Sequence, residues 1–382
     1  MKLLVITDAH LVIQNGQKVA YAPYVKEMDL WMNHVSHITF LCPDKISTPL
    51  LAQAFKRQDF KQIGLRRLEF HRFSSVVLSL LSLPFQTFQL CNAMRKADHI
   101  HLRCPGNLAL LASMIQIFFP RKQKTVKYAG NWDPQSTQPF AYKWQKAILS
   151  NPRLSKNIQI LVYGAWPDQS KNVLPFFTAS YHRTQIQSPY ERLWDGPIYA
   201  VFVGTLSPNK RPLELLEIAA ELIKKGIDFH LHFYGNGKLY TALEQRVTAL
   251  GLENRVRLHG NVGQDELIKA YQKAHFSFLL SKSEGWPKAV AEAMFWGCIP
   301  VATPVSCVPW MLDFDKESKK ASRGMLISNL DQAAPIIKSM LDQPEVLEKM
   351  SQNAAEWSQQ YTMEDFEEAI VKVLQQPKDS AL

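Results

Sequence analysis

The stretch Phe276–Pro304 reads FSFLLSKSEGWPKAVAEAMFWGCIPVATP, and it decides how the rest of the chain is interpreted. Its apolar start, Phe276–Leu280, is typical of a buried strand. Pro287 suits the first position of a helix, because the N–H group there has no partner within the helix. The predicted helix runs to Gly297, which can end it by adopting a positive φ. Ile299–Thr303 is then predicted to be the next strand.

Two glutamates flank the predicted start of this helix. Glu284 lies in the loop before it, and Glu292 follows on the helix eight positions later. Between them, Gly285 and Trp286 lie where a helix begins at the end of a strand. Free N–H groups and the helix dipole at such a place favour an anionic ligand in the crevice above a parallel sheet. Alternatively, Glu292 is a solvated residue that pairs with Lys288, although this order of lysine and glutamate is the weaker one.

The two glutamates and their neighbours resemble the Glu-x7-Glu motif of retaining glycosyltransferases of family 4. The resemblance is carried by Ser281, Glu284-Gly285, Pro287, Glu292-Ala293-Met294, Gly297 and Pro300-Val301-Ala302-Thr303. It implies an α/β protein of the GT-B fold, with two doubly wound Rossmann-like domains facing a central cleft. It also implies that Glu284 hydrogen-bonds the hydroxyls of the donor sugar and that Glu292 binds the ribose. Gly285, Trp286 and Pro287 would complete this part of the donor site.

Length and composition agree with a two-domain globular protein. The chain has 382 residues, of which 46% are hydrophobic and 20% charged, enough for two domains of ordinary size. The formal charge of +10 favours anionic partners, such as nucleotide phosphates or acidic lipids. No nucleic-acid-binding motif is present, so no nucleic-acid partner is expected. The five cysteines are odd in number and include no C-x-x-C pair. Asp8 interrupts the N-terminal apolar stretch before it reaches the length of a signal peptide. Both observations lead us to expect a cytoplasmic protein.

Strands and helices alternate along the chain, which predicts parallel sheets covered by helices on both faces. In the first half we expect strands at Lys2–Thr7, His37–Cys42, His99–Arg103, Thr125–Tyr128 and Ile158–Val162, and helices at Lys18–Val35, Ser75–Lys96 (bent at Pro84), Asn107–Phe119 and Phe140–Leu149, with a loop at Asp8–Gln17 and an irregular segment at Pro43–Arg72. In the second half we expect strands at Ile198–Gly204, Phe229–Gly235, Val256–Gly260, Phe276–Leu280, Pro300–Thr303 and Met325–Ser328, and helices at Pro212–Lys225, Leu239–Leu250, Asp265–Lys273 and Pro344–Gln376.

The proline-flanked segment Ser188–Pro197, SPYERLWDGP, is predicted to link the two domains. We therefore expect an acceptor-binding domain at residues 1–193 and a nucleotide-sugar-binding domain at residues 194–359. The resemblance implies that the last helix, within residues 360–382, packs back on the first domain.

A glycine-bearing turn follows the first strand of the second domain and ends at a helix start. Gly204 permits close backbone approach and Lys210 supplies a compact cation, as a diphosphate site requires. Alternatively, Lys210 is only a solvated residue at a helix start. Family 4 enzymes usually have an arginine directly after this glycine, but here Thr205 occupies that position. Arg211 could substitute for it from another angle.

Further donor-binding residues are expected from the resemblance. Gly235 and Gly237 follow a strand and open a helix, like the family's turn beside the nucleotide, although such glycines also serve as plain tight turns. Val262 lies in a segment where relatives hold the base through backbone contacts, which leaves UDP and GDP both open. Gly16, in the loop after the first strand, is also assigned to the donor site.

Three residues of the first domain are candidates for the active site. Arg103 ends a strand where many relatives have an active-site histidine. It is interpreted either as a contact to the donor phosphate or an acidic acceptor, or as part of a structural ion pair. Asn131 and Trp132 lie in a polar and aromatic loop that could bind a sugar acceptor, with Trp132 as a stacking face. The same loop could instead be an ordinary turn.

No catalytic metal and no cofactor are expected. Asp313-Phe314-Asp315 imitates the metal-binding Asp-x-Asp motif of the other glycosyltransferase fold, but the predicted architecture is wrong for that fold. The donor substrate is expected to be a nucleotide-diphosphate sugar, with neutralisation by Lys210 and helix termini.

The sequence thus predicts a retaining glycosyltransferase that moves a sugar to a glycan or lipid-linked acceptor, with a place in surface polysaccharide or glycolipid synthesis. Two alternatives remain open: a non-catalytic nucleotide-sugar-binding subunit, which Thr205 favours, and a nucleotide-sugar epimerase or phosphorylase of the same fold.

A basic segment precedes an apolar one in the first half. Lys56–Arg72 has six cations and two acids, and Val76–Phe88 is apolar but too short to span a bilayer. One interpretation is peripheral attachment to an anionic membrane surface on its inner face. The other is a surface loop followed by a buried helix.

Overall fold

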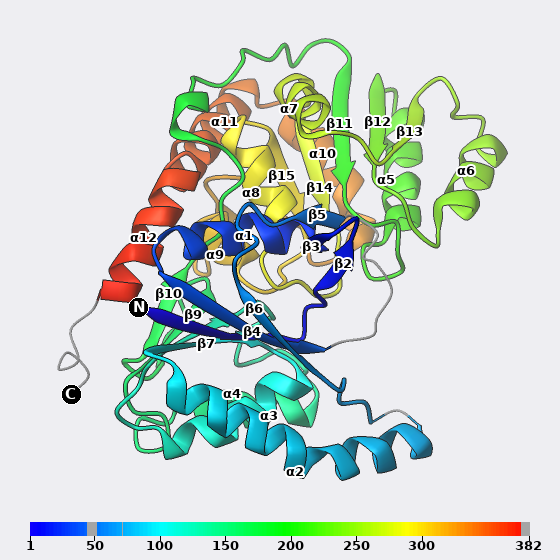
Figure 1. Ribbon diagram of the computed structural model, residues 1–382. Coiled ribbons are helices and arrows are strands. Elements are labelled where there is room, and N and C mark those ends of the chain that lie inside the picture. Colours follow the sequence, from blue (N-terminus) through cyan, green and yellow to red (C-terminus); the bar gives the residue numbers. More distant parts are fainter. Residues whose placement is uncertain (44–51, 71, 376–382) are drawn as a thin grey trace. The chain divides into compact units, whose positions relative to one another are not determined.

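The computed structural model describes residues 1–43, 52–70 and 72–375 of the chain. These residues form two compact units (Figure 1). The first runs from Met1 to Phe176 and resumes at Phe366, and the second is Phe177–Asp365. The division therefore falls at Phe176/Phe177, before the expected boundary at residues 193/194.

The first unit is built on a parallel sheet of seven strands in the order β10-β9-β8-β7-β1-β4-β6. The strands are β1 (Lys2–Ile6), β4 (His37–Pro43), β6 (Lys61–Leu65), β7 (His99–Cys104), β8 (Gln123–Tyr128), β9 (Ile158–Tyr163) and β10 (Val173–Phe176). Helices α2 (Phe73–Lys96), α3 (Asn107–Ile115) and α4 (Phe140–Ser150) cover one face, and α1 (Ala22–Asn33) lies on the other (Figure 1). This unit is doubly wound, as the alternation of elements predicts.

The region after β1 differs from the prediction of a loop followed by a long helix. Val12–Gln14 (β2) pairs antiparallel with Gln17–Tyr21 (β3), so the chain forms a hairpin before α1 begins. Asn15 and Gly16 form its turn, with φ values of 50° and 76°. Asn-Gly is the strongest short signal for such a turn. The predicted helix start at Lys18 was therefore wrong.

The segment predicted to be irregular, Pro43–Arg72, contains two further strands. Ala52–Ala54 (β5) pairs with β3, and β6 pairs with β4 at the edge of the large sheet. Residues 44–51 and 71 of that prediction lie outside the described residues. The predicted bend at Pro84 does not interrupt α2, which is assigned as one helix across that residue.

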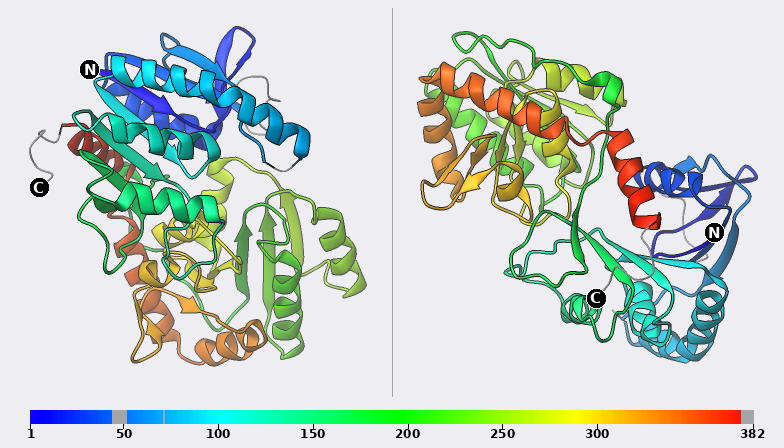
Figure 2. Two further views of the ribbon diagram at one scale, coloured as in Figure 1. Left: turned by 90° about the horizontal axis from the view of Figure 1, so that it is seen from below. Right: turned by 90° about the vertical axis from the view of Figure 1, so that its left-hand side faces the viewer.

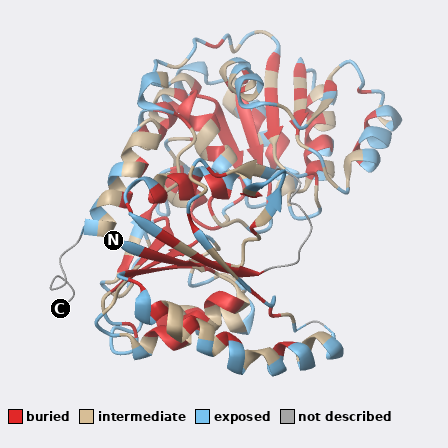
Figure 3. Cartoon of the chain, viewed as in Figure 1, coloured by how far each residue is buried: buried red, intermediate tan, exposed pale blue. Residues whose placement is uncertain are grey.

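The second unit is built on a parallel sheet of six strands in the order β13-β12-β11-β14-β15-β18. The strands are β11 (Ile198–Val203), β12 (Phe229–Tyr234), β13 (Val256–Gly260), β14 (Phe276–Leu279), β15 (Ile299–Ala302) and β18 (Met325–Leu326). The helices are α5 (Pro212–Lys224), α6 (Tyr240–Ala249), α7 (Gln264–Lys273), α8 (Lys288–Phe295), α9 (Val308–Met311), α10 (Ala333–Leu341) and α11 (Pro344–Ser358), and a short hairpin joins β16 (Phe314–Asp315) to β17 (Lys320–Ala321). Buried residues follow the strands of both sheets (Figure 3). The strands expected in this half all form, within one or two residues of their predicted ends.

The tail was predicted to be helical, with a last helix within residues 360–382, and it forms two helices. Helix α11 ends at Ser358, and α12 (Met363–Gln375) begins after a break. The side chains of Thr362 and Asp365 each accept from the other's backbone N–H, at 3.2 and 3.1 Å. This reciprocal pattern is a capping box that starts a new helix. Residues 376–382 of the expected last helix lie outside the described residues.

From Phe366 on, α12 belongs to the first unit. Glu367 accepts hydrogen bonds from His34 at 2.8 Å and Asn33 at 3.2 Å, at the end of α1. The ring of Phe366 lies 5.6 Å from that of Phe176. Both views in Figure 2 likewise show α12 beside the first unit's own elements.

The segment predicted as the interdomain linker is fixed to the second unit by a buried arginine. Arg192 donates to the carbonyl oxygens of Ala274 at 2.7 Å, Trp296 at 3.0 Å and Tyr271 at 3.3 Å. Its guanidinium group thereby satisfies three buried acceptors of that unit, which makes this stretch part of the domain rather than a free connection.

Candidate functional site

The ends of two neighbouring strands bring Lys210 and Glu284 together in the second unit. β11 and β14 are parallel neighbours in the sheet, so the loops that follow them lie side by side. Lys210 follows β11 and Glu284 follows β14, and their Nζ and Oε1 atoms lie 2.5 Å apart. Lys210 is therefore not the solvated residue of the alternative interpretation. It forms an ion pair with the first glutamate of the motif.

Backbone and amide contacts fix these two loops to each other. Asn209 accepts from the N–H of Lys282 at 2.9 Å through its carbonyl and donates from its side chain to the carbonyl of Ser283 at 3.0 Å. The N–H of Lys210 also donates to the carbonyl of Ser207 at 3.0 Å, closing a tight turn. The ion pair is thus held by the surrounding backbone, and Asn209 was missed by sequence reasoning because its partners are distant in the chain.

The Lys210–Glu284 ion pair is mostly buried, but a ligand can still reach it. The side chain of Lys210 is 23% exposed and that of Glu284 is 11% exposed. A short charge-assisted hydrogen bond in such a setting is stronger than a surface ion pair. Because part of the lysine remains exposed, an anionic ligand could reach it and replace the carboxylate as its partner.

The loop that bears Glu284 is also held from the strand on its other side. β15 is followed by Thr303, whose hydroxyl donates to the carbonyl of Ser281 at 2.7 Å, and by Ser306, whose hydroxyl donates to that of Gly285 at 2.8 Å. Ser306 adopts a positive φ of 51° in doing so. These two hydroxyls position the motif loop. Ser306 was not anticipated from the sequence.

Helix α8 begins one residue later than predicted. Pro287 is the residue before the helix, with φ of −77° and ψ of 74°, and Lys288 is the first helical residue. Trp286 is buried, with 8% of its surface exposed. Gly297 ends the helix with a φ of 69°, as predicted. The strand–helix–strand unit that the sequence indicated is therefore present, and Gly285 to Pro287 lie directly before the first turn of its helix.

Glu292 accepts from three side chains on α8 and neighbouring elements. Its Oε1 accepts from the Ser180 hydroxyl at 2.7 Å and lies 3.4 Å from Lys288 Nζ, and its Oε2 accepts from the Tyr271 hydroxyl at 3.5 Å. The ion pair with Lys288 that was considered as the alternative does form, but it is one contact of three. Burial and the neighbouring Glu292 carboxylate raise the pKa of Tyr271 well above its usual value. Ser180 and Tyr271 were both missed because their sequence context carries no signal.

The glycines of the two turns are explained by close backbone packing. A Cβ atom on Gly235 would lie 2.0 Å from the carbonyl oxygen of Gly204, and one on Gly237 would lie 2.4 Å from that of Leu206. The N–H of Leu206 also donates to the carbonyl of Asn236 at 3.1 Å. The turns after β11 and β12 therefore pack directly against each other, and Gly235 and Gly237 are required whether or not a nucleotide lies beside them.

The remaining residues of the second unit that were predicted to bind the donor follow β11 and β13. Thr205 is exposed, next to Gly204. Arg211 adopts a left-handed conformation before α5, and its Nε atom lies 4.0 Å from Glu214. Val262 packs against a cluster of buried hydrophobic residues that includes Tyr234. The role of Arg211 as a replacement for the missing arginine stays a prediction.

Arg103 forms a buried structural ion pair in the first unit. Its two terminal nitrogens donate to the two carboxylate oxygens of Glu27 on α1. The guanidinium also lies 5.2 Å from the centre of the Tyr24 ring. Burial alone would raise the pKa of Glu27. The charges of Arg103 and Lys127, together with the hydrogen bond from Arg103, outweigh this effect and the pKa is lowered. The structure therefore favours the ion-pair interpretation of Arg103, and the expected catalytic contact is not supported.

The predicted acceptor-binding residues and Gly16 also belong to the first unit. Trp132 is 3% exposed and packs edge-on against Tyr128, with ring centres 4.8 Å apart. A stacking role for Trp132 is therefore contradicted, since the ring is buried in the core. Asn131 accepts from the N–H of Asp133 at 2.9 Å and so closes a turn, which is the alternative interpretation. Gly16 lies at the tip of the β2–β3 hairpin.

The two aspartates of the Asp-x-Asp sequence have protein partners. Asp313 accepts from the Ser322 hydroxyl at 2.7 Å, and Asp315 accepts from the N–H groups of Glu317 at 3.0 Å and Ser318 at 3.1 Å. Among residues 1–43, 52–70 and 72–375, no three His, Cys, Asp or Glu side chains lie together as metal ligands.

Comparisons with known proteins agree with this arrangement. Over 98% of the chain, the structure resembles Anabaena HepE in complex with UDP and glucose, with a TM-score of 0.66 and 14% identity over 99% of that chain. It resembles the lipopolysaccharide outer core galactosyltransferase WaaB to the same extent, with a TM-score of 0.67 and 16% identity over 99% of that chain. These likenesses establish the fold: the chain is a GT-B protein with two Rossmann-like domains, as the sequence predicted.

Sequence comparisons define the family. Residues 185–357 match the model of the family described as glycosyl transferases group 1. An alpha-D-kanosaminyltransferase of Streptomyces kanamyceticus is 27% identical over 45% of this chain and 43% of its own length. A GDP-mannose:cellobiosyl-diphosphopolyprenol alpha-mannosyltransferase of Xanthomonas campestris is 30% identical over 28% of each chain. The chain thus matches less than half the length of these relatives. The match to the family model lies within the second unit.

Proposed function

We propose that this protein is a retaining glycosyltransferase that moves a sugar from a UDP- or GDP-sugar to a glycan or lipid-linked acceptor. The observation that carries the proposal is the ion pair of Lys210 and Glu284 at the ends of β11 and β14. It places a cation and a carboxylate at the carboxyl edge of a parallel sheet, where ligands of doubly wound proteins bind. The family match of the same unit supports the reaction class.

The two side chains suit the two parts of a nucleotide-sugar donor. In the proposed complex, Lys210 turns from Glu284 to the diphosphate and stabilises the charge that builds on it as the bond breaks. Glu284, released from the lysine, accepts hydrogen bonds from the sugar hydroxyls. Glu292 holds the ribose, with Ser180 and Tyr271 orienting its carboxylate.

The proposed reaction proceeds on one face of the sugar. The bond from the anomeric carbon to the diphosphate oxygen breaks, and a bond from that carbon to the acceptor oxygen forms on the same side. The acceptor's proton passes to the departing phosphate. Lys210 and the first turn of α8 would neutralise the diphosphate, so the proposal includes no catalytic metal and no cofactor.

The names of similar proteins support the substrate classes. One relative is named as a GDP-mannose-dependent transferase acting on a diphosphopolyprenol, and structural neighbours were solved with UDP or UDP-glucose. WaaB is described as a lipopolysaccharide outer core enzyme. We therefore propose that the acceptor belongs to surface polysaccharide or glycolipid synthesis. The absence of a C-x-x-C pair from the sequence supports the further proposal that the protein works in the cytoplasm.

A donor screen tests this proposal. The protein is incubated with UDP- and GDP-sugars, with glycan and polyprenyl-diphosphate acceptors, and nucleotide diphosphate release is measured. Release that needs an acceptor, with a product of unchanged anomeric configuration by NMR, is the expected result. Donor binding without turnover would favour the non-catalytic subunit instead. A new nucleotide sugar formed without acceptor would indicate an epimerase, and a requirement for inorganic phosphate would indicate a phosphorylase.

A further inference from the structure

Helix α2 of the first unit buries polar side chains and exposes apolar ones. Its buried positions include Ser79 and Gln86. The Ser79 hydroxyl bonds to the backbone of Glu69 at 3.0 Å, and the amide of Gln86 donates to the carbonyl of Arg66 at 3.1 Å. These polar contacts attach the helix to the segment between β6 and α2. Burial of apolar surface therefore accounts for only part of how α2 is held, and much of its apolar surface faces outward.

The outward side of α2 is a continuous apolar stripe, which we name the α2 face. It consists of Phe73 (87% exposed), Val77 (39%), Leu78 (44%), Leu80 (53%), Leu81 (73%), Phe85 (60%) and Phe88 (65%). Leu81, Phe85 and Phe88 are spaced by four and three residues, so they lie in one row along the helix. Figure 3 shows the exposed side of α2 turned away from the sheet that it covers. Seven exposed apolar side chains gathered on one side of a helix mark an interaction site.

Cations lie at both ends of the α2 face. Arg66, Arg67 and Arg72 are exposed at its start, and Arg95 and Lys96 are exposed at its end. The 24 residues of α2 contain no Asp or Glu. Acids lie close to both ends: Glu69 lies 3.4 Å from Arg67 and so offsets one of the arginines. Asp98, two residues after α2, is exposed and accepts a hydrogen bond from the N–H of Lys2.

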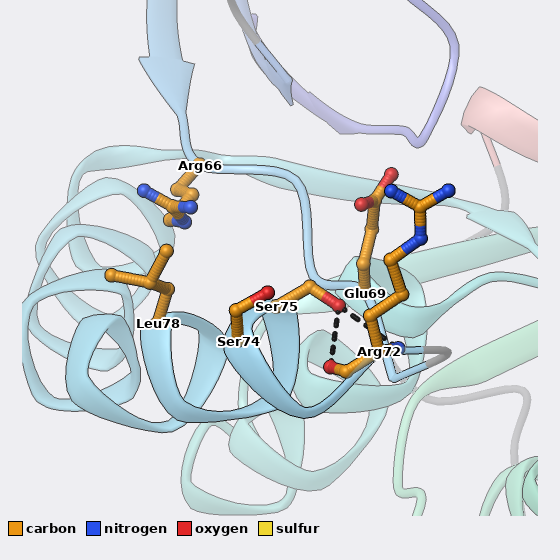
Figure 4. Close-up of a pocket in the computed structure, with 6 residues that line it drawn as sticks. All are labelled: Arg66, Glu69, Arg72, Ser74, Ser75 and Leu78. Carbon is orange, nitrogen blue, oxygen red and sulfur yellow. Dashed lines mark hydrogen bonds between the residues drawn. The ribbon is translucent and has the colours of Figure 1, made fainter.

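A pocket joins the cations to the apolar stripe. It has a volume of about 440 Å³ and is lined by Arg66, Glu69, Arg72, Ser74, Ser75 and Leu78 (Figure 4). The Ser75 hydroxyl bonds to the backbone N–H and carbonyl of Arg72 at 3.2 and 2.8 Å, which fixes that arginine at the start of α2. Leu78 belongs both to the pocket and to the α2 face. Two arginines beside an apolar surface match a lipid phosphate and its acyl chains.

We propose that the α2 face lies on the surface of an anionic membrane, with Arg66 and Arg72 binding lipid phosphates. A helix with an apolar side and basic flanks lies in the plane of the interface, where its apolar side chains enter the headgroup boundary and its cations attract acidic lipids. At about 1.5 Å per residue α2 is roughly 36 Å long, so its two basic ends can contact separate headgroups. This inference concerns attachment and does not depend on the proposed reaction.

Two other occupants fit the observations less well. A second copy of the chain, packed on this face by two-fold symmetry, would bring cationic helix ends against cationic helix ends in either orientation, and like charges in an interface are unfavourable. Within the described residues, α2 is the one helix long and apolar enough to cross a membrane. The helix is longer than the apolar run Val76–Phe88 that the sequence analysis judged too short. Its hydrogen bonds through Ser79 and Gln86 hold it against the first unit instead, which favours a helix lying on the surface.

Vesicle flotation tests the proposal with the full-length chain. Wild-type protein is mixed with phosphatidylcholine vesicles that contain or lack phosphatidylglycerol, at low and high salt. We expect flotation with the anionic vesicles only, and its loss as salt rises. Leu81→Gln and Phe85→Gln should each weaken the partition by about tenfold. Arg66→Ser and Arg72→Ser should each weaken it by about fivefold.

Matched variants elsewhere in the same unit serve as controls. Phe140 is 79% exposed on α4, and Arg153 is also exposed. Phe140→Gln and Arg153→Ser should leave the partition unchanged. Circular dichroism confirms that every variant is folded, and because the four test positions are exposed, each is expected to fold.

Three results would overturn the proposal. Equal flotation with neutral and anionic vesicles would show that the arginines do not select acidic lipids. Unchanged partition in both glutamine variants would show that the α2 face is not the contact. A wild-type dimer that dissociates in Leu81→Gln, with no vesicle binding at any salt concentration, would assign this face to a second copy of the chain.

Discussion

The pairing of Lys210 with Glu284 makes a quantitative prediction for Glu284→Gln. The substitution keeps the size of the side chain and some hydrogen bonding but removes the charge. A hydrogen bond to a charged group contributes about 1.5–3 kcal/mol, which corresponds to a roughly tenfold to 150-fold loss of rate if it forms with the sugar as the reaction proceeds. Because the sugar hydroxyls matter most as positive charge develops at the anomeric carbon, kcat should fall more than donor affinity.

Two companion variants separate the parts of the site. Lys210→Ala should lower both kcat and donor affinity, because the diphosphate is anionic before the reaction and more so at the transition state. Glu292→Gln should mainly weaken donor binding, because the ribose does not change during transfer. Steady-state kinetics on the three variants, with nucleotide diphosphate release as the signal, give kcat and KM for each.

Stability distinguishes a functional pair from a structural one. Lys210 retains 23% exposure, so water can solvate it when Glu284 is replaced, and we expect a loss of no more than about 1 kcal/mol in the free energy of unfolding. The pair of Glu217 and Arg246 is a matched control in the same unit, with Oε1 and Nε 2.7 Å apart and both side chains about half exposed. Glu217→Gln should leave kcat and KM unchanged.

The reasoning would be refuted by activity that hardly changes. If folded Glu284→Gln, Lys210→Ala and Glu292→Gln all turned over donor within about twofold of wild type, the difference would be only ~0.4 kcal/mol. The assignment of these residues to catalysis and donor binding would then be abandoned. A non-catalytic nucleotide-sugar-binding subunit would become the better hypothesis.

Three other predictions concern Arg103, Lys127 and the role of metal. Arg103→Met should lower the free energy of unfolding in urea by about 3–5 kcal/mol, because the buried carboxylate of Glu27 loses its hydrogen-bonded partner. Adding Glu27→Leu should restore most of the loss. If Arg103 acted only in the active site, the urea midpoint would not change. Burial lowers the pKa of Lys127 to about 7, so the Lys127 amine binds its proton more tightly in the unfolded chain than in the folded one. The free energy of unfolding of the wild type should therefore rise relative to that of Lys127→Met as pH rises from 7 towards 10, by on the order of 3 kcal/mol. A difference between wild type and variant that does not depend on pH would contradict the lowered pKa. EDTA should leave turnover intact, whereas activity that is abolished by EDTA, restored by manganese and lost in Asp313→Asn or Asp315→Asn would assign a metal to those aspartates.

The fold of the second unit was predictable because its signals are local. Each of its strands is a short apolar run that ends at a turn, and buried parallel strands are read from that pattern without knowledge of their neighbours. The motif stretch Phe276–Pro304 specifies its own strand, helix and strand, down to the glycine that ends the helix. The first unit was predicted less well at its start, where the Asn15-Gly16 turn was treated as a plain loop and the hairpin was missed.

The candidate site was predictable only in part, since its contacts join distant parts of the chain. Lys210 and Glu284 were chosen separately, and nothing in the sequence states that they pair. Arg103 has the residue type and position of a functional group, but whether it faces a ligand depends on Glu27, a residue of another element. Trp132 shows the same limit: an aromatic residue in a polar loop can be exposed or buried, and the core that surrounds it decides.

The two glycine turns show why a match to a family's ligand-binding glycines needs a structure to interpret it. Gly235 lies so close to the carbonyl of Gly204 that any side chain would force the turns after β12 and β11 apart. The turn after β11 leads directly to Lys210, whose position depends on the contacts of Asn209 with the Glu284 loop. A side chain at Gly235 would therefore disturb the ion pair through the backbone, without touching a donor. Loss of activity on such a change would be evidence for the packing of the turns, and evidence for donor contact has to come from Lys210, Glu284 and Glu292 themselves.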